Sequence, residues 1–231
     1  AGRVTALDLE PILKAPGVVA VLTAEDIPGH NDISPKEVGD DPAITPERVN
    51  FYGQVLFCVI AETRMEARRA VKLARIATAP SMPVIDVDDA LVANTTVLPE
   101  YAFVRGDPIV EIPQAPREIT GEFRIGGQEH FYLEGQIALA IPGEDGDMYV
   151  HSSTQHPTEV QHVVAHALAV HDNAVTVEIR RMGGGFGGKE SQATQWAVLA
   201  ALAARKTGRP CKVRLDRDDD MIMTGKRHDF R

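Results

Sequence analysis

Apolar residues recur along the chain at two different spacings, which divide it into strands and helices. Alternating or continuous apolar runs predict strands at residues 18–22, 55–61, 136–141, 148–153, 175–181 and 212–215. Helical spacing predicts helices at 64–77, 159–170 and 192–206, the last of which ends before Gly208 and Pro210. Both element types therefore occur in the first and the second half of the chain.

Two segments lack a regular apolar spacing. Residues 28–48 are rich in glycine, proline and aspartate, which predicts a long excursion at the surface. Leu98 to Pro116 is rich in proline and contains the turn-forming triplet Arg105-Gly106-Asp107, so it is interpreted as a linker between domains. The part before this linker carries no catalytic constellation, which favours a scaffold role for it.

Composition and charge narrow the class of protein. Acidic residues number 33 against 24 basic ones, and no stretch concentrates lysine and arginine with aromatics, so no nucleic-acid partner is expected. No apolar run reaches the length of a membrane span and no signal segment opens the chain, so no membrane partner is expected either. Cys58 and Cys211 stand far apart in apolar surroundings, as reduced thiols do, which indicates a cytoplasmic protein.

The strongest chemical signal is a glycine run between a predicted strand and a predicted helix. Five of the six residues from Gly183 to Gly188 are glycine, and Lys189 and Glu190 follow directly. Glycine allows positive φ and lets a ligand approach the backbone closely. The amide groups at the start of the following helix would favour an anion or an oxygen-rich group. The run therefore predicts a ligand-facing loop.

Two other interpretations of the run remain open on these residues alone. Gly183, Gly185 and Gly188 satisfy G-x-G-x-x-G, and Asp216 follows the next strand where a dinucleotide-binding unit has its ribose-binding acid. The strand before the run alternates apolar and polar residues, whereas the first strand of such a unit is buried on both faces. The glycines could also serve tight packing alone, as in a non-catalytic interaction domain.

Several motifs in the second half occur in an order typical of one enzyme family. They are Gly126 to Glu134, Ser153-Thr154-Gln155, Arg181 to Glu190, Thr207 to Pro210, Asp216 to Met221, and Thr224 to Phe230. Over roughly the last hundred residues the chain resembles the molybdopterin-binding part of the molybdenum hydroxylase family, which includes xanthine dehydrogenases. The last of these motifs resembles the bacterial type, and the first half resembles the family's α/β hammerhead domain.

The resemblance implies a fold and a domain order. The fold class is α+β, with an α/β hammerhead-like domain at 1–97, the linker at 98–116, and the first part of a mixed α+β molybdopterin-binding domain at 117–231. The family's general-base glutamate and a substrate-facing arginine are expected beyond Arg231. The resemblance therefore implies an N-terminal portion of the large subunit with an incomplete active site, inactive alone.

The resemblance also implies a reaction and its cofactors. A molybdenum ion held by a pterin dithiolene hydroxylates an electron-poor carbon, here of purines, from hypoxanthine to xanthine to urate. The alternative within the family is an aldehyde oxidase, and a less favoured one is an NAD-binding domain that uses the glycine run. FAD, 2Fe–2S clusters and NAD are expected on a flavin and iron–sulfur partner subunit or other parts of the enzyme.

Three positions of this sequence carry the family's site residues. Gln155 is expected to hydrogen-bond an oxygen on molybdenum, and the Phe186-Gly187 backbone to lie against an apical ligand of the metal, neither side chain being a direct ligand. Glu190 is expected to face the substrate, where a carboxyl group can hold a purine ring nitrogen or exocyclic oxygen. The simpler alternatives are that Gln155 caps the helix near Pro157, and that Glu190 is a first-turn acid of its helix.

Other polar residues are assigned no chemistry. Gln128, Glu129, His130 and Glu134 have no spacing that suits a metal site, so supporting roles are expected. His162 and His166 share a helical face at i, i+4, but without a third ligand the pair is interpreted as non-metallic. The acidic run 216–220 is interpreted as a solvated turn.

Overall fold

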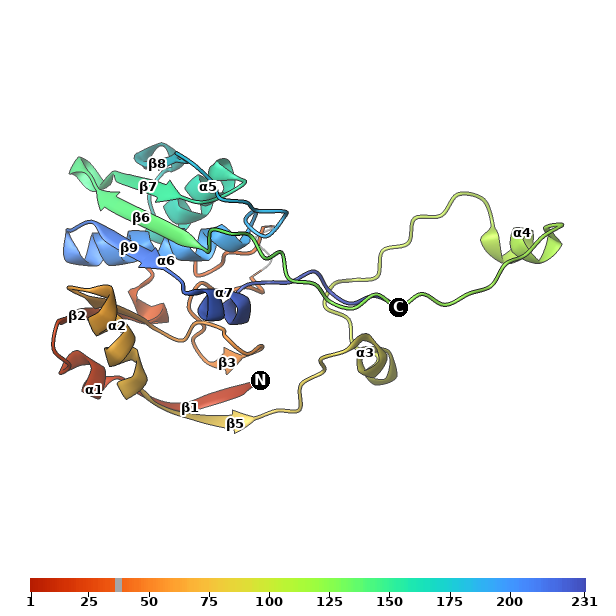
Figure 1. Cartoon of the computed structure of the whole chain (residues 1–231), viewed down its shortest axis with the longest axis horizontal. Helices are drawn as coiled ribbons and strands as arrows, with labels where there is room; N and C mark the ends of the chain where they lie inside the picture. The colour runs from red at the N-terminus through yellow and green to blue at the C-terminus, as the bar shows by residue number, and fades with distance from the viewer. Residues whose placement is uncertain (36–38) are drawn as a thin grey trace. The chain divides into compact units, whose positions relative to one another are not determined.

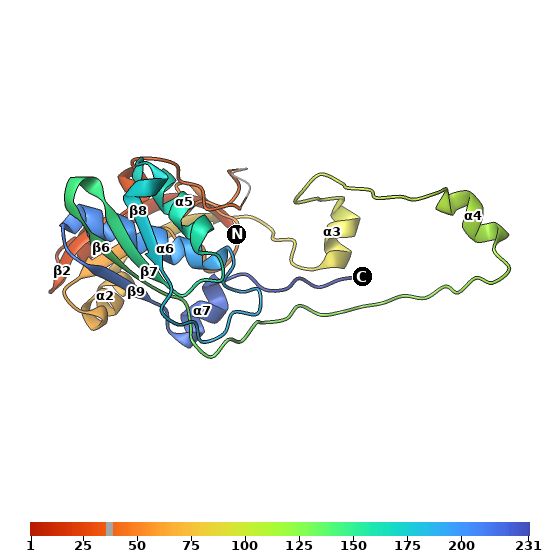
Figure 2. The ribbon, with the colours of Figure 1, turned by 90° about the horizontal axis from the view of Figure 1, so that it is seen from above.

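The computed structural model describes residues 1–35 and 39–231, which form two compact units (Figures 1 and 2). The first unit combines Ala1–Met82 with His130–Gly225. The second combines Pro83–Glu129 with Lys226–Arg231. Helices and sheets are mixed along the chain, which confirms the predicted α+β class.

The early part of the first unit holds two small antiparallel sheets. One has the order β3-β1-β5 and the other pairs β2 with β4. The elements of this part are β1 (Gly2–Asp8), α1 (Glu10–Leu13), β2 (Val18–Leu22), β3 (Arg48–Val49), β4 (Cys58–Ala61), α2 (Arg64–Ala70) and β5 (Arg75–Pro80). Thr63 begins α2 with a capping box, because its side chain accepts from Glu66 N while the Glu66 carboxylate accepts from Thr63 N.

The later part of the first unit is a four-stranded sheet covered by two helices. Its strand order is β8-β7-β6-β9, with β7 and β8 parallel and the other pairs antiparallel. The elements are β6 (Ile137–Pro142), β7 (Met148–Ser152), α5 (Pro157–Leu168), β8 (Val175–Glu178), α6 (Gln192–Thr207), β9 (Cys211–Arg214) and α7 (Arg217–Met223). The helices α5 and α6 pack against each other and against this sheet.

Helix α6 lies at the centre of the first unit. It contacts β6 and β9 on one side and β2 on the other, as Figure 1 shows. Its alanine-rich sequence is buried from Ala193 to Ala204 except at Gln195, and Trp196 is 2% exposed. A helix that is apolar around most of its circumference is stable only when it is covered on several sides. The two segments of the first unit consequently share one hydrophobic core.

Three predictions about the early part were wrong in detail. The helix expected at 64–77 ends at Ala70, and after a short 3-10 turn the chain forms β5, which pairs with β1. The strand expected at 55–61 begins at Cys58. The segment at 28–48, expected to be a surface excursion, buries Ile33 and Ile44. The Asn31 carboxamide holds Ile44 in place, because it accepts a hydrogen bond from the Ile44 N–H and donates one to the Ile44 carbonyl. Residues 36–38 of this segment lie outside the described residues.

The second unit contains α3 (Val87–Ala93), α4 (Pro108–Gln114) and two isolated β-bridges. The expected linker at 98–116 thus includes a short helix, for which the Asp107 side chain accepts hydrogen bonds from Ile109 N and Val110 N. Arg124 and Arg231 both form ion pairs with Asp88. Among the described residues, no helix combines the length and apolar character that crossing a bilayer requires.

Candidate functional site

The glycine loop, residues 183–188, connects β8 to α6 in the first unit. Gly184 has φ 95°, Phe186 has φ 54° and Gly187 has φ 88°. Positive φ is costly for a residue with a Cβ, so the conformation of Phe186 is held by its surroundings. The Phe186 side chain is 75% exposed. The loop therefore presents a strained backbone and an exposed aromatic ring to its open side.

Three of the glycines are required by close packing. A Cβ on Gly183 would lie 2.5 Å from Glu134 Cβ, and one on Gly185 would lie 2.3 Å from Gln155 Oε1. A Cβ on Gly188 would lie within 2.8 Å of the His130 and Tyr132 rings. By contrast, a Cβ on Gly187 would meet no atom within 4 Å. Tight packing thus explains part of the run and leaves open space at Gly187.

Gln155 holds the loop through its side chain and its backbone. Its Oε1 accepts hydrogen bonds from Gly187 N at 2.9 Å and Lys189 N at 3.3 Å, and its own N–H donates to Lys189 O at 2.8 Å. The alternative that Gln155 caps the following helix was wrong, because α5 has His156 at its N-cap and no side-chain capping bond. Since two N–H groups point at Oε1, the carboxamide orientation is fixed.

A buried lysine braces the loop from behind. Lys189 has a side-chain exposure of 0%, and its Nζ donates to Ser153 Oγ at 2.8 Å and to Glu134 Oε2 at 3.1 Å. The same Glu134 oxygen accepts from Gly183 N at 2.9 Å and from Ser153 Oγ at 2.5 Å. The Lys189 Nζ also lies 4.7 Å from the centroid of the Tyr132 ring.

Burial and hydrogen bonding set the ionisation of this pair. Burial lowers the pKa of Lys189, and the neighbouring Glu134 carboxylate only partly offsets that effect. For Glu134, burial raises the pKa, but the hydrogen bonds from Gly183, Ser153 and Lys189 outweigh it and hold the pKa below its usual range. This agrees with the supporting role expected for Glu134. The role of Lys189 was missed, because nothing in the sequence marks it as buried.

A second buried network lies beneath the loop. Asp220 is 1% exposed and accepts hydrogen bonds from Tyr132 Oη at 2.6 Å and from Gln136 N at 2.7 Å. Gln136 Nε2 in turn donates to Gly188 O at 3.0 Å. Burial and the Asp220 carboxylate raise the pKa of Tyr132. The prediction of a solvated turn at 216–220 was wrong at Asp220. Helix α7 begins at Arg217, and the Asp220 carboxylate on it is buried.

The expected site residues are only partly brought together. Gln155 lies between β7 and α5 and accepts a hydrogen bond from Gly187 in the glycine loop, which also contains Phe186. Glu190 is exposed and makes no side-chain hydrogen bond to the residues that the structure describes. Its alternative role as a first-turn acid was wrong, because α6 begins at Gln192 after Ser191 and has no acid in its first turn.

The strand order contradicts the dinucleotide-binding interpretation. A dinucleotide-binding unit needs its first two strands to be parallel neighbours in one sheet, with the glycine loop between the first strand and the helix. Here β8 and β9 lie at opposite edges of the four-stranded sheet, with β7 and β6 between them. Asp216, the expected ribose ligand, pairs with Arg64 and Arg68 instead.

The surroundings of Gln155 fit a group that carries hydrogen-bond-accepting oxygens. The Nε2 of Gln155 has no hydrogen-bond partner among the described residues, so both of its N–H donors remain for a ligand. The open space at Gly187 adjoins it. A hollow of about 300 Å³ lies close to the supports of the loop and is lined by Glu134 and Ser153 together with the apolar Ile137 and Leu139; Gln155 and Gly187 are not part of its lining.

Two family models match the chain. Residues 92–231 match the molybdopterin cofactor-binding domain. Residues 1–80 match the a/b hammerhead domain of aldehyde oxidase and xanthine dehydrogenase. Together they cover the two parts that the sequence motifs indicated.

Full-length relatives and solved structures agree with these models. The chain is 39% identical over 229 residues to xanthine dehydrogenase/oxidase of Mus musculus, and 40% identical over 228 residues to aldehyde oxidase 2 of Rattus norvegicus. These matches cover 99% and 98% of the chain, which spans 17% of the length of each relative. The aldehyde oxidoreductase from Desulfovibrio gigas superposes with a TM-score of 0.85 and 26% identity, over 99% of this chain and 27% of that one. Quinoline 2-oxidoreductase from Pseudomonas putida 86 superposes with a TM-score of 0.84 and 21% identity, over 97% of this chain and 30% of that one.

Proposed function

Because the chain belongs to the molybdenum hydroxylase family of xanthine dehydrogenases and aldehyde oxidases, we propose that it forms part of the molybdopterin-binding subunit of a purine hydroxylase. The proposed reaction takes hypoxanthine to xanthine and xanthine to urate. The observation that carries the cofactor part of this proposal is the Gln155 carboxamide, which is fixed at Oε1 while its Nε2 donors remain available beside the open backbone of Gly187.

Each loop residue has a defined task in the proposed site. Gln155 Nε2 donates a hydrogen bond to an oxygen of the cofactor, and the absence of a Cβ at Gly187 leaves room for close approach. The exposed Phe186 ring offers an apolar surface beside this approach. When bound, the molybdenum cofactor supplies the two-electron oxidation that hydroxylates an electron-poor carbon.

Glu190 is the proposed substrate-recognition residue. Its exposed carboxyl group lies two residues after the loop and is available to a bound molecule. A carboxylate accepts a hydrogen bond from a purine ring N–H, and its protonated form donates one to a ring nitrogen or exocyclic oxygen. A simple aldehyde offers no ring N–H, so a purine is the proposed substrate class and aldehyde oxidation the alternative.

The proposed enzyme has further parts. The resemblance of residues 224–230 to the bacterial type supports FAD, 2Fe–2S and NAD sites on a partner subunit, which would accept the electrons. For the assembled enzyme, a cytoplasmic location is proposed.

The test uses the assembled holoenzyme with Glu190→Gln. The kcat/KM for xanthine and hypoxanthine is expected to fall by about 10²–10⁴-fold, while turnover of an uncharged aldehyde and the molybdenum content stay unchanged. Glu47→Gln, at another exposed glutamate of the first unit, is the matched control and should alter neither activity. Equal loss for purines and aldehydes, or no loss for either, would refute the proposed role of Glu190.

A further inference from the structure

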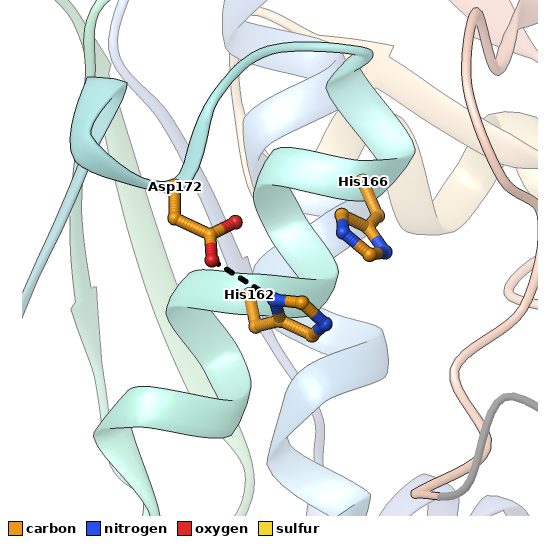
Figure 3. Close-up of side chains that lie close together, drawn as sticks. All are labelled: His162, His166 and Asp172. Carbon is orange, nitrogen blue, oxygen red and sulfur yellow. Dashed lines mark hydrogen bonds and ion pairs between the residues drawn. The ribbon is translucent and has the colours of Figure 1, made fainter.

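A histidine pair on α5 acquires a third partner in the folded chain. His162 and His166 lie one helical turn apart with ring centroids 4.0 Å from each other. The structure places Asp172, from the turn after the helix, beside them (Figure 3). His162 Nδ1 and Asp172 Oδ2 are 3.0 Å apart, and one ligand atom from each of the three residues lies within 4.8 Å of the others.

The turn that carries Asp172 is fixed independently of this contact. Helix α5 ends at Leu168 with Ala169 in the left-handed conformation, and a 3-10 turn at Asp172–Ala174 then leads into β8. The side chain of Gln161 ties this turn to the helix, since its Nε2 donates to Asp172 O at 3.1 Å and to Val175 O at 2.7 Å. The position of Asp172 is therefore preorganised by neighbouring bonds.

The electrostatics of this corner favour a cation. The last turn of an α-helix carries partial negative charge, and His166 lies in the last turn of α5. Two neutral imidazoles and one carboxylate supply a single further negative charge and three good donor atoms for a divalent ion.

We propose that His162, His166 and Asp172 bind a divalent transition-metal ion of the zinc class. Imidazole nitrogen and carboxylate oxygen are ligands that Zn²⁺ accepts, and three protein ligands leave a fourth position for water. Ligand atoms on a tetrahedral Zn²⁺ lie about 3.3 Å apart, given bond lengths of about 2.0–2.1 Å. The His162–Asp172 pair is already near this separation, and side-chain rotation brings in His166.

This site is separate from the proposed cofactor site. Gln155 lies just before the N-terminus of α5, whereas His166 is nine residues beyond Pro157, about 14 Å along the helix axis. A metal here would fasten the end of α5 to the turn that begins β8. It would stabilise this corner of the unit and take no part in the reaction at the glycine loop.

The experiment is calorimetric titration of ZnCl₂ into the full-length protein that carries this chain, after dialysis against a chelator. One saturable site is expected, weakened at least about tenfold by His162→Ala, His166→Ala or Asp172→Asn. The matched control is His156→Ala at the N-cap of the same helix, because His156 contacts Glu159 at the same 3.0 Å but has no second histidine beside it among the described residues. That variant should bind Zn²⁺ as the wild type does.

Thermal unfolding makes the test independent of how well the alanine variants fold. Zn²⁺ should raise the Tm of the wild type and of His156→Ala, because an ion that binds only the folded state stabilises it. It should raise the Tm of Asp172→Asn much less, and this variant keeps the size of the side chain and a hydrogen-bonding oxygen. The absence of a saturable site, or equal affinity in the wild type and Asp172→Asn, would overturn the proposal.

Discussion

Replacing Gly185 with alanine isolates the contact between the glycine loop and Gln155. The added Cβ would lie 2.3 Å from Gln155 Oε1, 2.7 Å from Cδ and 2.9 Å from Cγ, all atoms of one side chain. Because these atoms can move while the backbone stays, the carboxamide swings away from the loop. Its hydrogen bonds to Gly187 N and Lys189 N are then lost.

The size of the effect follows from these two bonds. A typical intramolecular hydrogen bond contributes about 0.5–1.5 kcal/mol, so the free energy of unfolding should fall by about 1–3 kcal/mol. Amide hydrogen exchange at Gly187 and Lys189 should accelerate, because both N–H groups lose their acceptor. Gly121→Ala is the control, since its added Cβ meets no atom within 4 Å and its backbone needs no positive φ.

A double-mutant cycle gives the result that would refute this reasoning. Gln155→Ala removes the atoms that the Gly185 Cβ would meet, so in that background Gly185→Ala should cost far less than in the wild type. Chemical denaturation measures all four proteins. If the two costs add without coupling, Gly185→Ala does not act through Gln155 and the described geometry of the loop is wrong.

Two further predictions concern the buried networks. Tyr132→Phe removes the donor to Asp220 and should lower the free energy of unfolding by about 1–3 kcal/mol in urea denaturation; a loss below about 0.5 kcal/mol would contradict the network. For Glu134, the folded pKa is depressed, so its stabilisation is complete above the unfolded pKa of about 4.3 and is lost as pH falls through the folded value. Glu134→Gln should therefore lose less stability than the wild type between about pH 5 and pH 3, measured by thermal unfolding, and identical pH profiles would contradict this.

The elements with a strong apolar period were predictable from the sequence. The strand at Val18–Leu22 and the helix at Gln192–Thr207 match their predicted positions to within a residue, because the apolar run in each local sequence coincides with the element. The helix expected at 64–77 failed at its end because residues 75–77 pair with β1, a distant strand, and this pairing overrides their local helical preference.

In the candidate site, too, local features could be predicted from the sequence, whereas contacts between distant residues could not. The glycine run predicts a ligand-facing loop from its own residues, and Gly187 has the open space that this requires. The supports of the loop join residues far apart in the chain: Lys189 contacts Glu134 across 55 positions, and Asp220 contacts Tyr132 across 88. No local pattern distinguishes these buried charges from solvated ones, so only the fold reveals them.

The most direct test of the central claim is the metal content of the native protein that carries this chain, purified from cells supplied with molybdate and measured by plasma mass spectrometry. We predict near-stoichiometric molybdenum in the wild type and in Glu190→Gln. A folded, intact protein that holds no molybdenum when isolated under these conditions would contradict the proposal that the glycine loop and Gln155 serve a molybdenum cofactor.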